Sequence, residues 1–315
     1  GTATAQDMLA DYAQYLRDLV PLEKSRKLKV VIDTGNGMGG FTVPAVLGDE
    51  IFAALPLEID AMYFELDGTF PNHEANPIDP ENLRDLQKRV LEVGADLGLA
   101  FDGDADRCFV VDEKGGIVDP STLTALIATR ELAKAPGSTI IHNLITSRAV
   151  PEIVLEHGGK PVRTRVGHSF IKATMAESNA IFGGEHSGHF YFRDFWKADS
   201  GMLAAMHTLA ALGEAPKSTT LSELLQPYLR YVMSGEINTK VSDAIVVVAK
   251  IGSAFADRAI DIDELDGLTI SLDSGWFNVR ASNTEPLLRL NVEAREPVAM
   301  AAIRDEVLGI MNGSL

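Results

Sequence analysis

Cysteine is almost absent from this chain of 315 residues, which contains only Cys108. A single thiol cannot form a disulfide within the chain or build a cysteine-based zinc cluster, so the sequence offers no redox or zinc-finger chemistry. Few cysteines and no disulfide are typical of proteins from a reducing compartment, and we expect a cytoplasmic protein.

Long apolar runs and positive charge are also scarce. No uncharged segment reaches the roughly 18 to 20 residues of a membrane-spanning helix, and the opening residues GTATAQDMLADYAQ do not resemble a secretory signal, so we expect no membrane partner. With 28 Lys+Arg against 45 Asp+Glu, the formal net charge is -17. This excess repels phosphate backbones, so we expect no nucleic-acid partner, and any anionic ligand needs a local cluster of basic residues.

What the chain does have is enough apolar sequence for a folded core, with 46% hydrophobic residues against 23% charged ones. Helical and strand-like stretches alternate, with glycine turns between them, up to about residue 230, and short strands dominate afterwards. The pattern predicts two mixed-sheet α/β domains followed by a small α+β domain. We place them at residues 1–108, 109–232 and 233–315.

Individual elements can be predicted from periodicity and from turn residues. Helices are expected over residues 4–20, 79–93, 120–134, 148–157 and 298–311. Strands are expected over residues 28–34, 59–65 and 138–142, over a short apolar stretch before residue 102, and over a hairpin at 110–118.

The segment Asp102–Arg107, with the sequence DGDADR, follows one of these strands. Its three carboxylates, Asp102, Asp104 and Asp106, alternate with small residues. Such crowded negative charge is costly unless a cation neutralises it, and oxygen ligands suit a hard divalent ion such as Mg²⁺. The spacing resembles the start of a calcium loop, but Arg107 stands where that loop requires glycine. A solvated acidic turn is the structural alternative.

A second polar segment, residues 183–189, has the sequence GGEHSGH. Glu185, Ser187 and two imidazoles form a mixture of donors and acceptors that suits sugar hydroxyls, and the glycines allow a ligand to approach the backbone. A serine nucleophile is not favoured, because neither Ser187 nor Ser169 lies in a complete G-x-S-x-G turn. Zinc is not favoured, because the histidines lack the helical i, i+4 spacing. A purely structural loop is the remaining alternative.

The third segment, residues 280–286, reads RASNTEP and follows the strand-like WFNV. It offers a guanidinium, two hydroxyls, an amide and turn N–H groups within a few residues, and this is a compact set of phosphate ligands. The candidate ligands are Arg280, Ser282, Asn283 and Thr284. An ordinary Asn/Ser-rich turn with an incidental arginine is the structural alternative.

One further motif points to a different class of protein. Residues 35–40, GNGMGG, satisfy the G-x-G-x-x-G pattern of dinucleotide-binding folds, and Asp60 lies about twenty positions further on. However, Pro44, Gly48 and Pro56 make the intervening segment a poor crossover helix. We therefore interpret the glycines as a tight turn between a strand and a helix.

Taken together and in this order, DGDADR, GGEHSGH and RASNTEP resemble the α-D-phosphohexomutase superfamily over nearly the whole chain. The stretches FPNHEANP, VGHSFIK and DSGMLAA are similar to phosphomannomutase/phosphoglucomutase sequences, as are His186 and Asn283 within the loops. Members of the superfamily have four domains around a cleft, and this chain resembles the second, third and fourth.

Two departures from the family pattern stand out. No serine here is followed by His-Asn-Pro, the family's phosphoserine signature, and no G-T-S-G-x-R-G motif occurs. The resemblance therefore implies that the first, phosphoserine-bearing domain is missing and that the chain alone is inactive. In addition, Ile145 stands where many relatives carry a substrate-contacting lysine.

The resemblance implies a mutase that interconverts hexose 1-phosphate and hexose 6-phosphate, of mannose or glucose, through hexose 1,6-bisphosphate. Asp102, Asp104 and Asp106 would hold Mg²⁺, with Arg107 as an electrostatic helper. Glu185 and Ser187 would bind sugar hydroxyls, and Arg280, Ser282, Asn283 and Thr284 the phosphate that does not react. His168 and His189 would carry protons or contact phosphate. The functional alternative is a sugar-phosphate binding module without turnover.

Overall fold

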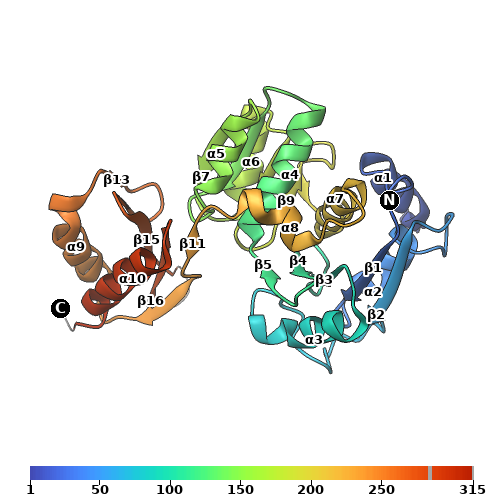
Figure 1. Cartoon of the computed structure of the whole chain (residues 1–315), viewed down its shortest axis with the longest axis horizontal. Coiled ribbons are helices and arrows are strands. Elements are labelled where there is room, and N and C mark those ends of the chain that lie inside the picture. The colour runs from blue at the N-terminus through green and yellow to red at the C-terminus, as the bar shows by residue number, and fades with distance from the viewer. Residues whose placement is uncertain (283–285, 314–315) are drawn as a thin grey trace.

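The computed structural model describes residues 1–282 and 286–313, which form three sheets flanked by helices (Figure 1). The chain builds the sheets one after another, each from a continuous stretch of sequence. The first two sheets mix parallel and antiparallel pairs, and the third is antiparallel. The predicted fold class, two mixed-sheet α/β domains followed by a small α+β domain, is confirmed.

The first sheet has the strand order β2-β1-β3-β4-β5. Its strands are β1 (Leu28–Asp33), β2 (Leu57–Met62), β3 (Leu97–Phe101), β4 (Cys108–Asp112) and β5 (Ile117–Val118). Its helices are α1 (Leu9–Leu19), α2 (Gly39–Val46) and α3 (Arg84–Val93), the last preceded by the 3-10 turn η1 (Pro80–Leu83). The helix predicted from residue 4 begins only at Leu9, whose N–H donates to the side chain of Asp7.

The boundary predicted near residue 108 falls inside this first sheet. β4 begins at Cys108 and pairs antiparallel with β3, and β5 then pairs with β4. The chain thus folds back onto the same sheet after the acidic loop, and the sheet ends only at Val118. The sequence pattern of a hairpin followed by a helix does not reveal which neighbouring sheet the hairpin joins.

The second sheet has the order β10-β9-β8-β6-β7. Its strands are β6 (Thr139–Asn143), β7 (Lys160–Thr164), β8 (Phe182–Gly184), β9 (Phe190–Phe192) and β10 (Ala198–Asp199). Its helices are α4 (Pro120–Lys134), α5 (Ala149–Glu156), α6 (His168–Ser178) and α7 (Gly201–Glu214), followed by the short α8 (Leu221–Leu225). The prediction of a helix over residues 120–134 matches α4, which Asp119 caps by accepting from the N–H of Ser121.

The third sheet lies in the C-terminal part and has the order β11-β16-β15-β14-β13, with β12 also on β16. Its strands are β11 (Val232–Met233), β12 (Ile237–Lys240), β13 (Asp261–Asp263), β14 (Leu268–Leu272), β15 (Gly275–Ala281) and β16 (Leu287–Ala294). Helices α9 (Ala244–Phe255) and α10 (Pro297–Met311) cover one face of this sheet, which lies at one end of the molecule (Figure 1).

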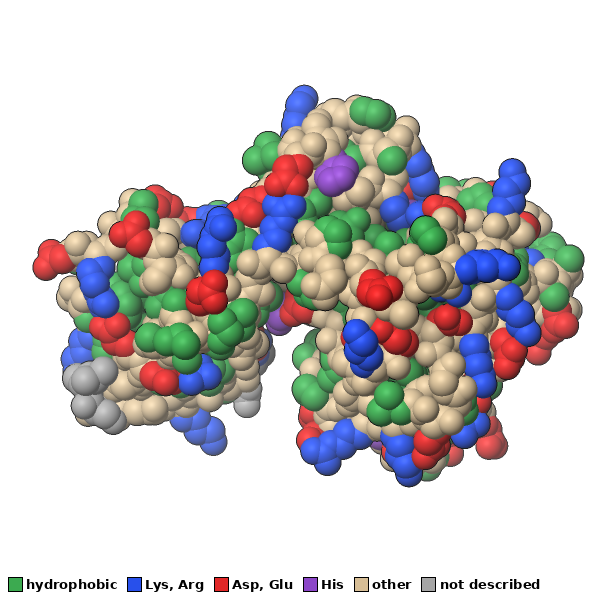
Figure 2. All heavy atoms as spheres, in the orientation of Figure 1, with side chains coloured by type: hydrophobic (Ala, Val, Ile, Leu, Met, Phe, Trp, Pro, Cys, Tyr) green, Lys and Arg blue, Asp and Glu red, His purple; other side chains and the backbone are tan. Residues whose placement is uncertain are grey.

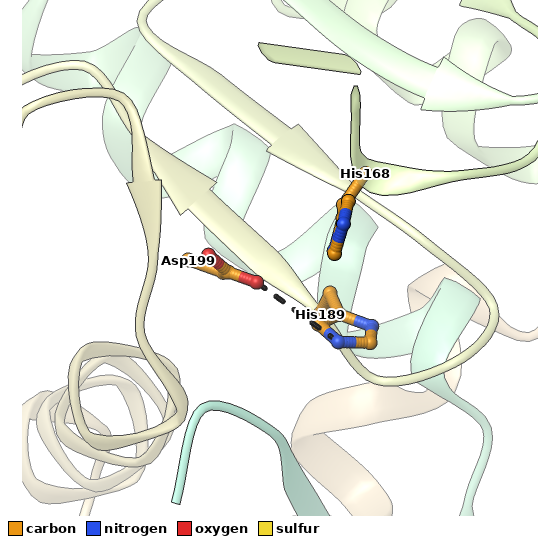
Figure 3. Close-up of side chains that lie close together, drawn as sticks. All are labelled: His168, His189 and Asp199. Carbon is orange, nitrogen blue, oxygen red and sulfur yellow. Dashed lines mark ion pairs between the residues drawn. The ribbon is translucent and has the colours of Figure 1, made fainter. Parts of the chain in front are cut away.

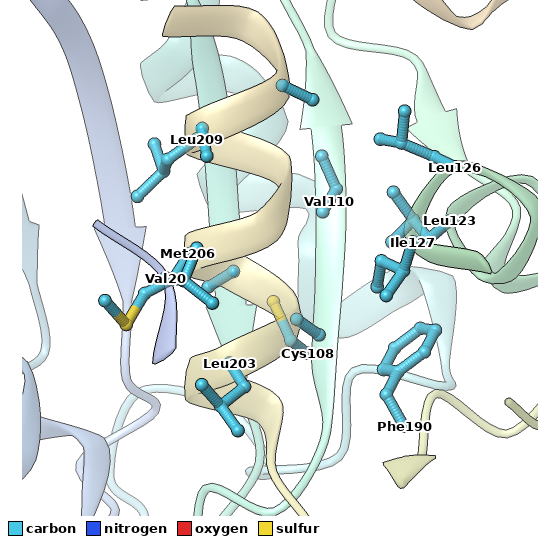
Figure 4. Close-up of a cluster of buried hydrophobic side chains, with 14 of the residues drawn as sticks. Val20, Cys108, Val110, Leu123, Leu126, Ile127, Phe190, Leu203, Met206 and Leu209 are labelled. Atoms are coloured by element: carbon cyan, nitrogen blue, oxygen red, sulfur yellow. The ribbon is translucent and has the colours of Figure 1, made fainter. Parts of the chain in front are cut away.

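The first two domains share one core, whereas the C-terminal domain has its own. Helix α7 returns from the second domain to the first sheet, and Leu203 and Met206 lie close to Cys108 and Val110 of β4 (Figure 4). Burial raises the pKa of the Cys108 thiol far above its usual range, so this thiol is a packing group. Within the described residues, no helix has the length and hydropathy needed to cross a bilayer.

Candidate functional site

Loops from all three domains line one cavity of about 440 Å³. The surface is hollowed between the C-terminal domain, at the left in Figure 2, and the first domain, at the lower right. The cavity is lined by Ile78 and Pro80 from the first domain, by Ser187 from the second, and by Arg280 and Arg289 from the third, among others. The structure therefore brings part of the predicted sugar loop and part of the predicted phosphate loop to one place.

The acidic loop follows β3 directly. Asp102, Asp104 and Asp106 each offer a carboxylate oxygen, and these atoms all lie within 4.8 Å of one another. Asp102 is buried, and its two oxygens accept hydrogen bonds from the backbone N–H and the Nε of Arg107. Arg107 thus neutralises one of the three carboxylates in this structure.

Asp106 lies farther from the Arg107 guanidinium than Asp102 does. Its Oδ1 is buried and has no hydrogen-bond partner among the described residues, with Arg107 Nε at 3.8 Å and His189 Nε2 at 3.6 Å. Burial, followed by the charges of Asp102, Asp104 and Asp199, raises the pKa of Asp106 to about 7. Converging oxygen ligands and an unpaired buried oxygen fit a hard divalent cation.

The glycine turn after β1, residues 35–40, packs against the acidic loop. The Met38 N–H donates to the carbonyl of Gly103 at 2.9 Å, and a Cβ on Gly37 would lie only 2.6 Å from the same oxygen. Only glycine allows this close approach at position 37. Residues 35–40 therefore form a strand-to-helix turn that packs against the acidic loop, and the helix that follows, α2, has eight residues with Pro44 inside it.

A second support comes from the segment FPNHEANP, and its key residue was missed in the sequence. His73 Nε2 lies 3.0 Å from Oδ2 of the buried Asp33 at the end of β1. This hydrogen bond raises the pKa of His73 to about 9. The neighbouring Ala75 carbonyl accepts from the Gly103 N–H at 3.2 Å. A lone histidine in a proline-rich loop gave no signal of such a role.

The predicted sugar loop divides into a buried part and a cavity-lining part. Glu185 is only 2% exposed, and its carboxylate accepts from Asn143 Nδ2 (3.3 Å), the Gly167 N–H (3.1 Å) and the Tyr191 hydroxyl (2.8 Å). Ser187, in contrast, lines the cavity, and its Oγ lies 3.0 Å from His189 Nδ1. Ser187 thus lines the described cavity, whereas the Glu185 carboxylate is buried, and the sugar-binding roles of both residues stay predictions.

His168 and His189 come together beside Asp199 (Figure 3). His189 Nε2 lies 3.9 Å from Asp199 Oδ2, and Lys172 Nζ lies 3.0 Å from Asp199 Oδ1. Burial lowers the pKa of His189, and the nearby carboxylate of Glu185 opposes that effect. A backbone bridge between Arg107 and His189 fixes this group against the acidic loop. Lys172 and Asp199 lie in the segments VGHSFIK and DSGMLAA, and the sequence did not identify either residue individually as part of the site.

The phosphate loop is described only in part. Arg280 lies near the end of β15, where its NH2 group donates to Glu236 Oε2 at 2.7 Å. The Ser282 N–H donates to the Leu287 carbonyl at 2.9 Å, while Asn283 and Thr284 lie outside the described residues. Ile145 is buried and lines the same cavity. The binding roles of these residues stay predictions.

Comparison with known families matches the three domains separately. Residues 10–116 match the phosphoglucomutase/phosphomannomutase alpha/beta/alpha domain II, residues 119–231 match alpha/beta/alpha domain III, and residues 236–310 match the C-terminal domain of the same family. The match to domain II includes β4 and ends just before β5, in agreement with the pairing of β4 with β3 in the first sheet.

Individual relatives agree with this assignment. The chain is 39% identical over 303 residues to a phosphomannomutase of Salmonella montevideo, covering 96% of this chain and 66% of that protein, and 38% identical over 314 residues to one of Escherichia coli, covering 99% and 69%. A phosphoglucomutase/phosphomannomutase family protein from Burkholderia thailandensis has a similar structure, with a TM-score of 0.87 and 31% identity over 99% of this chain and 66% of that one. The chain spans about two thirds of the length of the curated relatives it matches. It belongs to the phosphoglucomutase/phosphomannomutase family.

Proposed function

We propose that these 315 residues supply the metal-, sugar- and phosphate-binding parts of a phosphohexomutase. The reaction is the interconversion of hexose 1-phosphate and hexose 6-phosphate, of mannose or glucose, through a hexose 1,6-bisphosphate intermediate. The observation that carries the proposal is the shared cavity, which Ser187 of the sugar loop and Arg280 of the phosphate loop both line. The names of the relatives, phosphomannomutase and phosphohexose mutase, support the same chemistry.

The acidic loop is proposed as the metal site. Asp102, Asp104 and Asp106 would hold Mg²⁺, which when bound neutralises negative charge on the phosphoryl group that is transferred. Arg107, fixed against Asp102, adds a positive charge at the edge of this loop. Through its backbone bridge to His189, Arg107 also holds the acidic loop next to the sugar loop.

The other residues bind and orient the sugar phosphate. Arg280, together with Ser282, Asn283 and Thr284, binds the phosphate that does not react, since a guanidinium donates charged hydrogen bonds to a dianion. Ser187 binds a sugar hydroxyl. His168 and His189 carry protons or contact phosphate at the entrance between the loops. We assign Glu185 to hold the sugar loop in place, because all its described hydrogen bonds are internal.

Turnover requires a phosphoryl donor, and no Ser-His-Asn-Pro sequence occurs in these 315 residues. We therefore propose that they bind hexose phosphates without turnover unless a phosphoserine-bearing domain of the same family is supplied.

The test is a mutase assay with glucose 1-phosphate and mannose 1-phosphate, with the chain alone and with that separate domain added. We expect activity only in the mixture. Turnover by the purified chain alone would overturn the proposed dependence on the added domain. No activity in the mixture, together with no binding of either sugar phosphate, would overturn the proposed function itself.

A further inference from the structure

A second cavity, of about 370 Å³, lies between the second domain and the C-terminal domain. Its lining comes from β6, α5 and β7 of the second domain and from β14 and β15 of the C-terminal domain. Helix α5 and strand β7 lie on the side of the second domain that faces the C-terminal domain (Figure 1). None of the described residues that line this cavity belongs to the acidic, sugar or phosphate loop. The cavity is therefore distinct from the proposed sugar-phosphate site.

Arg148, at the start of α5, supplies this cavity with a positive charge. Its NH2 group donates to Ser271 Oγ at 2.5 Å, and its guanidinium carbon lies 5.6 Å from the centre of the Trp276 ring. The described residues include no ion-pair partner for this guanidinium, because the buried carboxylate of Glu293 instead accepts from the backbone N–H of Arg148 and from Trp276 Nε1. Arg148 thus keeps charged N–H donors for a ligand.

The other charged side chains of the cavity are already paired. Arg163 forms an ion pair with Asp263, and Glu152 forms one with Arg230. Burial lowers the pKa of His142 to about 4, and the charge of Arg163 lowers it further, so this imidazole is neutral near pH 7. The unpaired guanidinium therefore leaves the cavity with a single positive charge in excess.

Most of the remaining lining is apolar. It consists of Leu144, Pro151, Leu155, Pro161 and the ring of Trp276. One free cation beside such a lining suits a monoanion with an apolar body, since the charge is neutralised and the body leaves water. A phosphate dianion would bring more charge than the cavity neutralises, and a neutral ligand would leave the guanidinium unpaired.

We propose that this cavity binds a small organic carboxylate with an apolar or aromatic body, and that Arg148 holds the carboxylate group. The planar fork of a guanidinium matches the two oxygens of a carboxylate, and the apolar lining covers the body of the ligand. This site goes beyond the proposed function, because it takes a ligand of a different chemical class.

The second cavity shares a wall with the proposed sugar-phosphate site. Along one segment, His142, Leu144 and Thr146 line the second cavity, whereas Asn143 and Ile145 line the first. A ligand in the second cavity therefore contacts the same five-residue segment that lines the sugar-phosphate site. Occupancy of one cavity should change the affinity of the other, and this consequence alone rests on the proposed function.

Benzoate is the probe, titrated into the 315-residue chain and followed by NMR of its two tryptophan indole N–H groups. Trp276 lines the cavity, whereas Trp196 is 73% exposed and serves as an internal control. We expect a saturable shift of the Trp276 signal alone. Benzamide, which has the same shape without the charge, should bind roughly tenfold more weakly or worse. No saturable shift of Trp276, equal binding of benzamide, or equal binding of inorganic phosphate would overturn the proposal.

Substitution of Arg148 tests its role. Arg148→Gln should raise the Kd of benzoate by roughly tenfold or more. The control Arg258→Gln breaks an exposed pair with Glu306 and should leave this Kd unchanged. Should Arg148→Gln fail to fold, Leu155→Glu is the second variant, because Leu155 lines the cavity but is 62% exposed, and a carboxylate there should repel benzoate. An unchanged Kd in the folded variant contradicts the proposal.

The link between the two cavities is measured with glucose 1-phosphate. Saturating benzoate should change its Kd by about fivefold or more in the wild type and leave it unchanged in Arg148→Gln. The same Kd with and without benzoate in the wild type would overturn the link. Should glucose 1-phosphate not bind at all, the proposed function fails, and the shift of Trp276 by benzoate still decides whether the second cavity is a carboxylate site.

Discussion

The acidic loop and the arginine pair (Arg280 and Arg289) are clusters of opposite charge, and in each of them a residue of the other sign neutralises part of the charge. The loop gathers three carboxylates and neutralises one of them with Arg107, while the pair gathers two guanidiniums and bridges them with Glu236. Among the residues that the structure describes, each leaves buried polar atoms without a hydrogen-bond partner, at Asp106 Oδ1 and at the two Nε groups. Partial neutralisation of this kind lets a charged site fold before its ligand arrives and leaves charge for that ligand.

The two sites differ in how they are assembled. The acidic loop is one hexapeptide, whereas the arginine pair combines the segment before β12 with two neighbouring strands. A substitution in the loop should therefore act locally, on metal binding and on the repulsion among its carboxylates. A substitution at the pair should act through the register of the sheet.

The largest effect should come from Asp106→Asn. We expect Mg²⁺ binding to fall below detection in calorimetry, because one of three carboxylates is lost from a site that already binds a reluctantly dehydrated ion. In the presence of EDTA the same variant should be more stable than the wild type, by up to about 1 kcal/mol, because the repulsion of this half-buried carboxylate by Asp102 and Asp104 is removed. The exposed Asp257→Asn is the control. Unchanged Mg²⁺ affinity in Asp106→Asn would contradict the metal assignment.

The second comparison concerns the sugar loop. Glu185→Gln should lower the free energy of unfolding, because Glu185 holds this loop in place. The new amide NH2 would face the donors Asn143 Nδ2, the Gly167 N–H and the Tyr191 hydroxyl, so a loss of about 2 to 3 kcal/mol is expected. Urea unfolding measures it, with the exposed Glu177→Gln as the control. A fully stable variant with altered sugar preference would instead show that Glu185 contacts the sugar.

The support beneath the acidic loop is tested by Gly37→Ala. The added Cβ would press on the Gly103 carbonyl, and we expect a loss of about 1 to 3 kcal/mol together with weaker Mg²⁺ binding. Gly68→Ala is a matched control, since a Cβ there meets no atom within 4 Å. Equal behaviour of the two variants would mean that the turn does not support the loop.

The smallest effect concerns pH. The pKa of His73 is raised to about 9 by its hydrogen bond to Asp33, so the stability it contributes is fully present below the unfolded pKa, about 6.5, and is lost as the pH rises through 9. Between pH 6.5 and 9.5 the wild type should lose about 1 kcal/mol more than His73→Gln, after discounting for solvent screening. Parallel stability profiles of the two proteins would contradict this assignment.

Much of the fold could be predicted from local patterns. The helix at residues 120–134 and the strand from residue 28 were found because their apolar periodicity and flanking residues agree. The hairpin predicted at residues 110–118 was assigned to the second domain, but its strands belong to the first sheet, since pairing with β3 is a tertiary choice that no local signal records. The three motif loops were visible because each gathers its polar residues within seven positions of sequence.

What the sequence did not reveal depends on contacts across the fold. Arg289 and Glu236 come together with Arg280 only because of the register of β15 with β16 and the position of the segment before β12. Asp33 and His73 are 40 positions apart, with α2 and β2 between them, and the inward orientation of Glu185 depends on Tyr191 and Asn143. Periodicity and motif spacing do not record such long-range pairs.

The most direct measurement of the central claim is a crystal structure of the 315-residue chain with Mg²⁺ and glucose 1,6-bisphosphate. We predict the ligand in the shared cavity, with a phosphate against Arg280 and Arg289, a sugar hydroxyl at Ser187 and the metal on Asp102, Asp104 and Asp106. A ligand bound elsewhere, or a metal bound away from these three carboxylates, would contradict the account.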